Sequence, residues 1–379
     1  MTQPLASAQP SLITNKPVSE RLDFIDSLRG LAALYVVIFH AVLVPQTKLA
    51  IPGWIKPLVM NGGSGVTLFF VISAFTLCYT LQFQQKENRY LLKFYMRRIF
   101  RILPLYYAWF LLMLYISMGF RGLFAHKFIL LLYAVFGYNF VPGHQEGLVA
   151  ASWTLGIEMI FYLIFPLVFH YVKSIRGALM FLALTLIIAW SHTQFIKHLI
   201  GAGILQSDSY KINLSFFHQL PVFALGMVCY FIYVDVIKNK DVSLKIHLIL
   251  LSTGAILFFL LPYVIAPYLP SGTGLYFTAI NYTILFLGLS KIPVKLIVNK
   301  VTVFFGLLSY SLYLNHPQIV MRLNKTYIKI YDYAGNSGVA LVCCILLTLV
   351  IVVPLSYLTY RFIEQPCINY GKKLIKSIG

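Results

Sequence analysis

The chain has 379 residues, of which 59% are hydrophobic and only 11% are charged. A soluble domain carries about 25% charged residues, so this composition excludes an ordinary soluble enzyme and predicts a polytopic helical membrane protein. The 30 Lys and Arg residues outnumber the 11 Asp and Glu residues, which gives a formal net charge of +19. Most basic residues lie between apolar runs, where they act as orientation signals and lipid contacts, so no nucleic-acid partner is expected.

Apolar runs of membrane-spanning length recur along the whole chain. A spanning helix needs about 18–20 apolar residues, and runs of this kind cover residues 28–45, 65–83, 102–119, 127–141, 152–170, 176–191, 216–236, 246–263, 275–290, 301–320 and 338–362. The run 127–141 is short and contains Gly137 and Asn139, so we interpret it as re-entrant or tilted. The sequence therefore predicts an all-α bundle of about ten transmembrane helices, or eleven if this run crosses the membrane.

The chain divides into one membrane domain and two short ends. Residues 1–25 are polar and contain no apolar segment, which predicts a cytoplasmic tail rather than a cleaved signal peptide. Residues 26–366 form the predicted membrane domain, and residues 367–379 form a short basic cytoplasmic tail. The cysteines make no CxxC pair and no spaced His/Cys set, so we expect neither a disulfide framework nor a metal site: Cys78, Cys229, Cys343, Cys344 and Cys367.

The most basic segment, residues 86–101, lies between the second and third predicted spans. Its positive charge predicts a cytoplasmic loop, and the two spans before it then place the N-terminus in the cytoplasm as well. The C-terminal lysines place the other end on the same side, so we expect a multi-pass protein of the inner (plasma) membrane with both termini inside. Before the first span, Asp26 and Ser27 are candidate N-cap residues.

Two basic residues, Arg29 and His40, lie within the first apolar run. Their separation of eleven positions returns to nearly the same helical face with a rise of roughly 16 Å. One interpretation is an arginine that reaches the membrane surface and a histidine that is hydrogen-bonded to a neighbouring helix. The alternative is a phosphate-binding cation above a general base, a role that suits a neutral imidazole in a dry site.

Three arginines follow within the basic segment. On a helix, Arg101 lies three positions from Arg98 and four from Arg97, so their guanidinium groups share a face. At a membrane boundary such a cluster is commonly a topology signal. Guanidinium groups also bind phosphate bidentately, which makes binding of a phosphorylated cytoplasmic molecule the alternative.

Glu158 is the acidic residue that lies well inside an apolar run, in the segment SWTLGIE of residues 152–158. A buried carboxylate needs a cation, an imidazole or hydrogen-bond donors nearby. It could balance an arginine of the bundle. We favour a functional role in which it pairs with His40, orients the imidazole and stabilises the imidazolium form.

The segment FGLLSYSLYLNHPQIV, residues 305–320, carries Tyr310, Tyr313 and His316 at helical spacing. The tyrosines are typical of a packing stripe, whereas His316 is a candidate for a polar cavity. Glu364 follows near the end of the last predicted span, where we expect a structural contact to a basic loop rather than catalysis.

Taken in order, these segments resemble the bacterial acyltransferase-3 family of integral membrane O-acyltransferases. The resemblance extends over residues 22–370 and rests on six motifs: FIDSLRGLAALYVVIFHA, GVTLFFVISAF, RRIFRILP, SWTLGIEMIFYLIFP, LSYSLYLNHP and FIEQP. Small departures occur at Ala74, where a glycine is common, and at Thr154 and Gly156, where serines are common.

The resemblance implies transfer of an acyl group, commonly acetyl, from acyl-coenzyme A to a hydroxyl of an envelope carbohydrate. It assigns Arg29, Arg98 and Arg101 to the coenzyme A phosphates, His40 to the role of base or transient acyl carrier, and Glu158 to its support. Trp153, Tyr310 and His316 are then further substrate-binding candidates.

Our prediction is a membrane O-acyltransferase that modifies a glycan, such as O-antigen or exopolysaccharide, or a lipid-linked saccharide. We expect acetyl-CoA as donor substrate, membrane lipids as surroundings, and no permanently bound cofactor. The alternative is a proton-coupled transporter of a small anionic metabolite with Arg29, His40 and Glu158 along its path.

Overall fold

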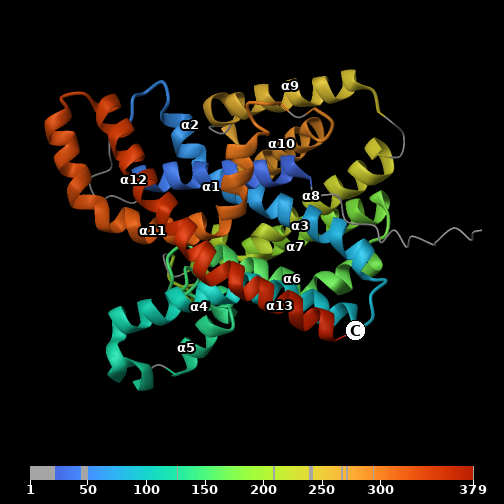
Figure 1. Cartoon of the computed structure of the whole chain (residues 1–379), viewed down its shortest axis with the longest axis horizontal. Helices are drawn as coiled ribbons and strands as arrows, with labels where there is room; N and C mark the ends of the chain where they lie inside the picture. Colours follow the sequence, from blue (N-terminus) through green and yellow to red (C-terminus); the bar gives the residue numbers. More distant parts are fainter. Residues whose placement is uncertain are drawn as a thin grey trace, which may run out of the picture.

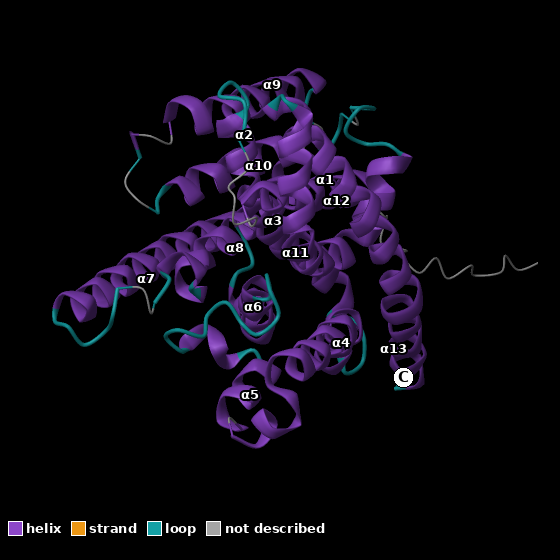
Figure 2. Ribbon diagram, turned by 90° about the vertical axis from the view of Figure 1, so that its left-hand side faces the viewer, coloured by secondary structure: helices purple, strands orange, loops and turns teal. Residues whose placement is uncertain are grey.

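The computed structural model describes residues 22–43, 50–125, 127–207, 210–238, 242–265, 268–269, 272–292 and 294–378. At residues 117–125 it describes the backbone only. Every regular element in these ranges is a helix, which confirms the predicted all-α fold (Figure 2). In chain order the α-helices are α1 Asp23–Leu43, α2 Lys56–Met60, α3 Gly65–Gln84, α4 Tyr90–Ala125, α5 Lys127–Ala134, α6 Trp153–Tyr171, α7 Ile175–Gly201, α8 Phe216–Phe231, α9 Leu244–Leu260, α10 Gly274–Leu289, α11 Lys300–Ala334, α12 Ser337–Thr359 and α13 Gln365–Ser377 (Figure 1).

Short turns of other helix types extend several of these elements. The 3₁₀ turns are Asn61–Ser64, Gly137–Phe140 and Ile212–Leu214, and the π-helical turns are Ile232–Lys238, Leu261–Ile265 and Tyr360–Glu364. The first 3₁₀ turn joins α2 to α3, and the last π turn joins α12 to α13.

Eight helical segments within the described ranges are long and apolar enough to cross a membrane: Asp23–Leu43, Lys56–Gln84, Tyr90–Ile116, Trp153–Tyr171, Ile175–Gly201, Phe216–Lys238, Leu244–Ile265 and Ser337–Ser377. Helix α10 is apolar but has only 16 residues. Helix α11 has 35 residues, but Ser311, Asn315 and His316 on its buried face make it less apolar. The protein is therefore a polytopic helical membrane protein, and the number of ten spans stays a prediction.

The short apolar run at 127–141 does not form a spanning helix. Helix α5 has eight residues, which corresponds to a length of about 12 Å. The chain then turns at Phe136, whose φ of 64° is left-handed, and the side chain of Asn139 hydrogen-bonds the carbonyl of Leu214 and the amide of Phe216. The run therefore ends in a turn that is fixed against the start of α8, instead of continuing as a spanning helix.

The first helix begins earlier than predicted. Because α1 starts at Asp23, both Asp26 and Ser27 lie inside the helix, so the N-cap prediction was wrong. Ser27 is buried and accepts a hydrogen bond from Thr302 Oγ1 at 3.0 Å. Its polarity therefore serves a contact between α1 and α11, which local sequence could not reveal.

The basic segment and the C-terminal tail also differ from their predictions. The basic segment, expected as a cytoplasmic loop, is non-helical only up to Arg89. Helix α4 begins at Tyr90 and continues through Pro104, so the arginines share a helix, as their spacing indicated. The expected tail forms helix α13, which packs along α4 with Gly371 against the ring of Phe100. In Figure 1, α13 is the red helix that ends at the C-terminus.

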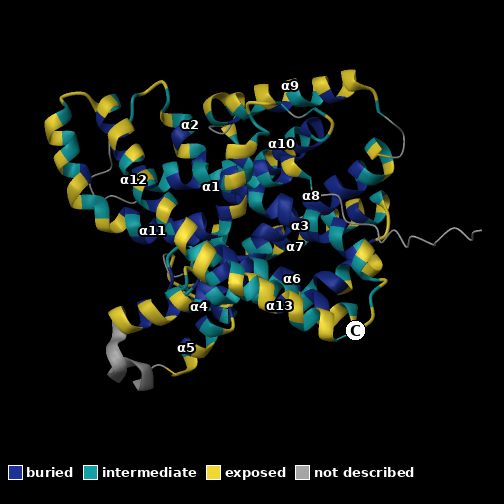
Figure 3. Cartoon of the chain, in the orientation of Figure 1, coloured by how far each residue is buried: buried dark blue, intermediate teal, exposed yellow. Residues whose placement is uncertain are grey.

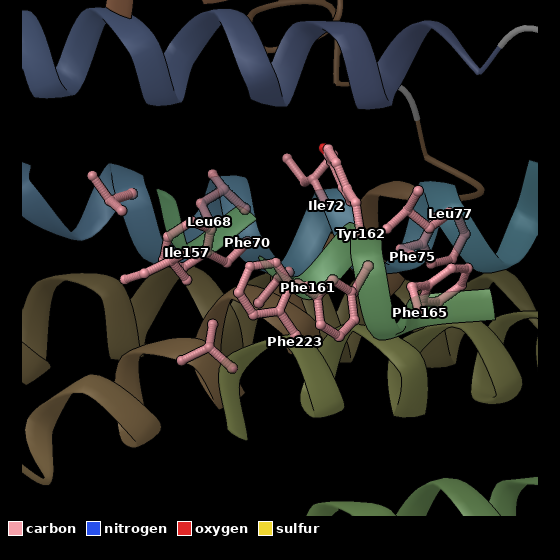
Figure 4. Packing of buried hydrophobic residues seen from close by; sticks show 14 of the residues in the cluster. Leu68, Phe70, Ile72, Phe75, Leu77, Ile157, Phe161, Tyr162, Phe165 and Phe223 are labelled. Atoms are coloured by element: carbon pink, nitrogen blue, oxygen red, sulfur yellow. The ribbon is translucent and has the colours of Figure 1, made fainter. Parts of the chain in front are cut away.

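The core is built from aromatic side chains of α3, α6 and α8. Phe223 stacks on Phe161 and on Phe70, with ring centroids 4.1 and 4.6 Å away (Figure 4). The outer helices expose large apolar side chains such as Met180 and Val350, which are 74% and 70% exposed (Figure 3). Apolar surface of this kind is expected where helices face lipid.

Helices α1 and α11 approach so closely that their backbones touch. A Cβ atom on Gly306 would lie 2.0 Å from the carbonyl oxygen of Asp26, and one on Gly30 would lie 2.4 Å from that of Thr302. Small residues at helix contacts permit such close packing in membranes. His40 and His316 each follow ten residues after these glycines, and their rings are in contact. The two helices are therefore parallel, and the glycine contact sets their register.

We expect Gly306→Ala to lower the midpoint of thermal unfolding in detergent, because its Cβ must displace the carbonyl of Asp26. Overpacking of this kind costs about 1–3 kcal/mol. Gly201→Ala on α7 is the matched control, since nothing lies within 4 Å of its Cβ position. Equal unfolding midpoints for the two variants would contradict the close approach.

Candidate active site

Three of the predicted arginines converge on one cavity of about 280 Å³. It lies between α1, α3, α4, α6 and α11, and Arg97 joins the arginines around it. Glu158 is the one carboxylate among the described residues that line it: the charged residues are Arg29, Arg97, Arg98, Arg101 and Glu158. The cavity therefore carries an excess of positive charge, which is suited to binding an anion.

The arginines around this cavity, called the arginine cavity below, are not equivalent. Arg97 forms an ion pair with Glu87 at 2.7 Å. Arg29 donates to Thr76 Oγ1 at 3.4 Å, and Arg98 lies over the ring of Phe94 at 4.0 Å and donates to the carbonyl of the same residue. Within the described ranges, no carboxylate lies within 4.0 Å of the guanidinium groups of Arg29, Arg98 or Arg101.

Glu158 is held by hydroxyl groups rather than by an imidazole. Its Oε1 accepts a hydrogen bond from Ser73 Oγ at 2.6 Å and another from the hydroxyl of Tyr162. The carboxylate also interacts electrostatically with Arg29 and Arg98. Tyr162 lies four positions after Glu158, and this helical spacing could have identified it from the sequence.

The predicted pairing of Glu158 with His40 is not formed. No hydrogen bond joins the two side chains in the part of the chain that the structure describes. Helix α6 directs Glu158 to Ser73 on α3. His40 lies eleven residues beyond Arg29 on α1, about 16 Å further along the helix axis.

His40 instead faces His316 of α11, with ring centroids 4.9 Å apart. Nδ1 of His40 lies 2.9 Å from the carbonyl of Val36, and Nδ1 of His316 lies 3.1 Å from that of Leu312. A carbonyl oxygen can only accept, so each Nδ1 carries the proton and each Nε2 is left with a free lone pair. Nε2 of His316 is buried and has no partner among the described residues.

Tyr313 connects the histidines with the arginine cavity. It lines that cavity, its ring centroid is 5.6 Å from that of His316, and its hydroxyl accepts from Thr154 Oγ1 at 3.0 Å. Tyr310 lines the same cavity, but its hydroxyl donates to the carbonyl of Ile102 at 2.7 Å. The hydroxyl of Tyr310 thus joins α11 to α4, as expected of a packing residue.

Trp153 does not line the arginine cavity. It lies on a second cavity of about 530 Å³, which also includes Phe39, the neighbour of His40. Val66 lines both cavities, so the two meet at the start of α3. The predicted site residues are therefore distributed over two adjacent cavities. Among the described residues, His40 and His316 line neither cavity, but each contacts a wall residue of one of them.

Glu364 interacts electrostatically with Arg101, so the predicted contact with the basic segment is formed, but with helix α4 and not with a loop. It is 2% exposed and accepts a hydrogen bond from Ser311 of α11. Ser311 in turn accepts from Thr359 at 3.0 Å, and Thr359 accepts from Asn315 at 2.9 Å. This buried network joins α11 to α12 and the turn after it, so Glu364 has a structural position beside the histidine-bearing helix.

Comparison with known proteins gives a consistent family. The acyltransferase domain of the acyltransferase-3 family matches residues 22–360. The O-acetyltransferase OatA of Staphylococcus aureus is 25% identical over 380 residues, which covers 92% of this chain and 57% of OatA. "Putative acetyltransferase ORF330" of Acidianus two-tailed virus is 28% identical over 311 residues, which covers 77% of this chain and 81% of that protein.

No solved structure matches the chain. The chain spans a little more than half the length of the OatA proteins that it matches, at 57%. The match to the family nevertheless includes every arginine, histidine and tyrosine described above at the two cavities, because it runs from residue 22 to residue 360. This protein therefore belongs to the acyltransferase-3 family.

Proposed function

We propose that the protein is a membrane O-acetyltransferase that takes an acetyl group from cytoplasmic acetyl-CoA and transfers it to a hydroxyl group of an envelope carbohydrate. The observation that carries this proposal is the arginine cavity, whose wall residue Tyr313 contacts His316 of the pair His40 and His316. The O-acetyltransferase names of the relatives support the reaction class.

In this proposal the protein binds acetyl-CoA through the phosphate groups of the donor. Coenzyme A carries several phosphate groups, and the guanidinium groups of Arg29, Arg98 and Arg101 have no carboxylate within 4.0 Å among the described residues. Arginine binds phosphate through paired, charge-assisted hydrogen bonds. The thioester arm then extends from the arginines towards His40, a rise along α1 of about 16 Å.

His40 acts as the general base in this mechanism. Its Nε2 takes the proton of the acceptor hydroxyl while the oxygen attacks the thioester carbonyl. The new C–O bond forms, the C–S bond breaks, and the proton on His40 passes to the departing thiolate, which leaves as the free thiol of coenzyme A. The hydrogen bond from Nδ1 to the carbonyl of Val36 holds the tautomer that this role requires.

Glu158 has a different role from the one first expected. Its partners are hydroxyl groups and its charge acts on Arg29 and Arg98. We assign it to the positioning of the arginines, because a carboxylate fixed by Ser73 and Tyr162 lowers their mutual repulsion without pairing directly with them.

A proton-coupled transporter is the second candidate. The observation in its favour is that two cavities meet at Val66 with a pair of titratable side chains beside them. The two functions can be distinguished with the protein in proteoliposomes. An acetyltransferase releases free coenzyme A thiol from acetyl-CoA, whereas a transporter releases none.

Replacement of the base tests the mechanism directly. We expect His40→Ala to lower the rate of thiol release by about 10²–10⁴-fold, the range typical of a general base. His198→Ala is the control, because His198 is exposed at the end of α7. Full activity of His40→Ala at normal membrane levels would show that His40 is not the base.

Removal of a phosphate-binding arginine should affect donor binding. A hydrogen bond to a charged group is worth about 1.5–3 kcal/mol, so Arg98→Ala should raise the KM for acetyl-CoA by about 10- to 150-fold. Arg176→Ala is the control, since Arg176 is exposed at the start of α7.

The truncated donor S-acetylpantetheine provides a sharper comparison for the same variant. It lacks the phosphates, so we expect Arg98→Ala and the wild type to turn it over with similar KM. A loss of the same size with both donors would indicate that Arg98 supports the fold of the cavity instead of binding phosphate.

A further inference from the structure

The second cavity differs from the arginine cavity in position. Along α3, the arginine cavity extends from Val66 to Gln84, whereas the second cavity is bounded by the turn before α3 and by Val66 and Thr67 at its start. Helix α1 runs antiparallel to α3, and on it Arg29 lines the first cavity and Phe39, ten residues later, lines the second. The two cavities therefore lie in series along the bundle.

The second cavity also differs in charge. None of the described residues that line it is Asp, Glu, Lys or Arg. Its walls combine neutral polar groups with one indole ring: Ser64, Thr67, Asn213, His218, Gln219 and Trp153. Its volume of about 530 Å³ is in the range of roughly 300–1,000 Å³ that is typical of small-molecule sites.

Two buried polar atoms of this cavity lack partners among the described residues. Gln219 is 5% exposed, and its Nε2 donates to the carbonyl of Asn213 at 2.7 Å while its Oε1 has no partner. His218 is 6% exposed; its Nε2 makes no hydrogen bond of standard geometry within the described ranges, and the backbone of Gly272, which interacts with the ring, lies beside it. An unsatisfied buried group costs about 1–3 kcal/mol, so a ligand with hydroxyl groups would relieve both.

We propose that this second cavity, called the acceptor cavity below, binds an uncharged sugar unit that carries the hydroxyl to be acetylated. Sugar hydroxyls both donate and accept, which matches the carbonyl oxygen of Gln219 and the ring nitrogen of His218. The ring of Trp153 lies edge-on to that of Phe70, with ring centroids 6.5 Å apart. Its indole would pack against the apolar C–H face of a pyranose ring. The inference rests on the proposed function in one respect, namely that a hydroxyl group of the bound sugar is the one that is acetylated.

The position of the acceptor cavity relative to the histidines supports this assignment. Phe39 lines the cavity, and its ring contacts that of His40 with centroids 5.0 Å apart. On the other side, His316 contacts Tyr313 of the arginine cavity. The histidine pair thus lies between wall residues of the two cavities, the position from which it would act on a donor in one and an acceptor in the other.

Binding can be measured apart from turnover by tryptophan fluorescence. The full chain is placed in lipid nanodiscs free of glycoside detergent and titrated with methyl β-glucoside, and with glucuronate as the anionic counterpart. We expect the neutral glycoside to change the fluorescence and glucuronate to have little effect. Trp153→Phe should abolish the signal, whereas Trp190→Phe, at a 66% exposed position on α7, should retain it.

Two variants test the walls of the acceptor cavity. Loss of one hydrogen bond of about 0.5–1.5 kcal/mol should weaken glycoside binding by about two- to twelvefold in Gln219→Ala and in His218→Phe. Gln219→Glu keeps the size and shape of the side chain but adds a negative charge, so it should weaken glycoside binding further. Unchanged affinity in all three variants, or equal binding of glucuronate and glycoside, would overturn the proposal.

A kinetic measurement separates this inference from the proposed function. With acetyl-CoA and methyl β-glucoside, Gln219→Ala should raise the KM for the glycoside more than the KM for acetyl-CoA, and Arg98→Ala should do the reverse. Glycoside binding without any thiol release in the wild type would refute the acetyltransferase and leave the sugar site standing. Thiol release with no glycoside binding would refute the sugar site alone.

Discussion

The close contact between α1 and α11 is the constraint on which the candidate site depends. Because Gly30 and Gly306 let the two backbones touch, the parallel helices can take only one register along their length. His40 and His316 follow these glycines at the same interval and therefore arrive at the same level. A side chain at either glycine would separate the helices and, with them, the two imidazoles.

The second organising feature is an uneven distribution of charge. Among the described residues, four arginines and one glutamate surround one cavity, although charged groups are costly within a membrane domain. Arg97 is neutralised by Glu87, and Glu158 is fixed by Ser73 and Tyr162. The remaining positive charge is what a phosphorylated donor would neutralise, while the acceptor cavity contains no charged residue in the part that is described. The two cavities thus suit two different substrates.

Much of the fold followed from local pattern, and the errors have definite physical causes. Long apolar runs identified the helices because lipid requires them, and the run at 127–141 was rightly treated as doubtful. The basic segment is a loop only up to Arg89, because charge indicates a membrane boundary but does not show where a helix begins. The N-cap prediction for Asp26 and Ser27 is wrong, because the contact of Ser27 with Thr302 joins residues that are far apart in the chain.

The sequence by itself determined the class of protein, the family resemblance and the residues of interest, because composition, hydropathy and spacing are properties of short stretches of chain. Arg29, Arg98, Arg101, Glu158 and the histidines could all be named in advance. Only the tertiary structure decided which of them meet. Glu158 lies with Ser73 and Tyr162, and His40 lies with His316, because these contacts depend on how α1, α3, α6 and α11 pack and on the depth at which each side chain enters the bundle.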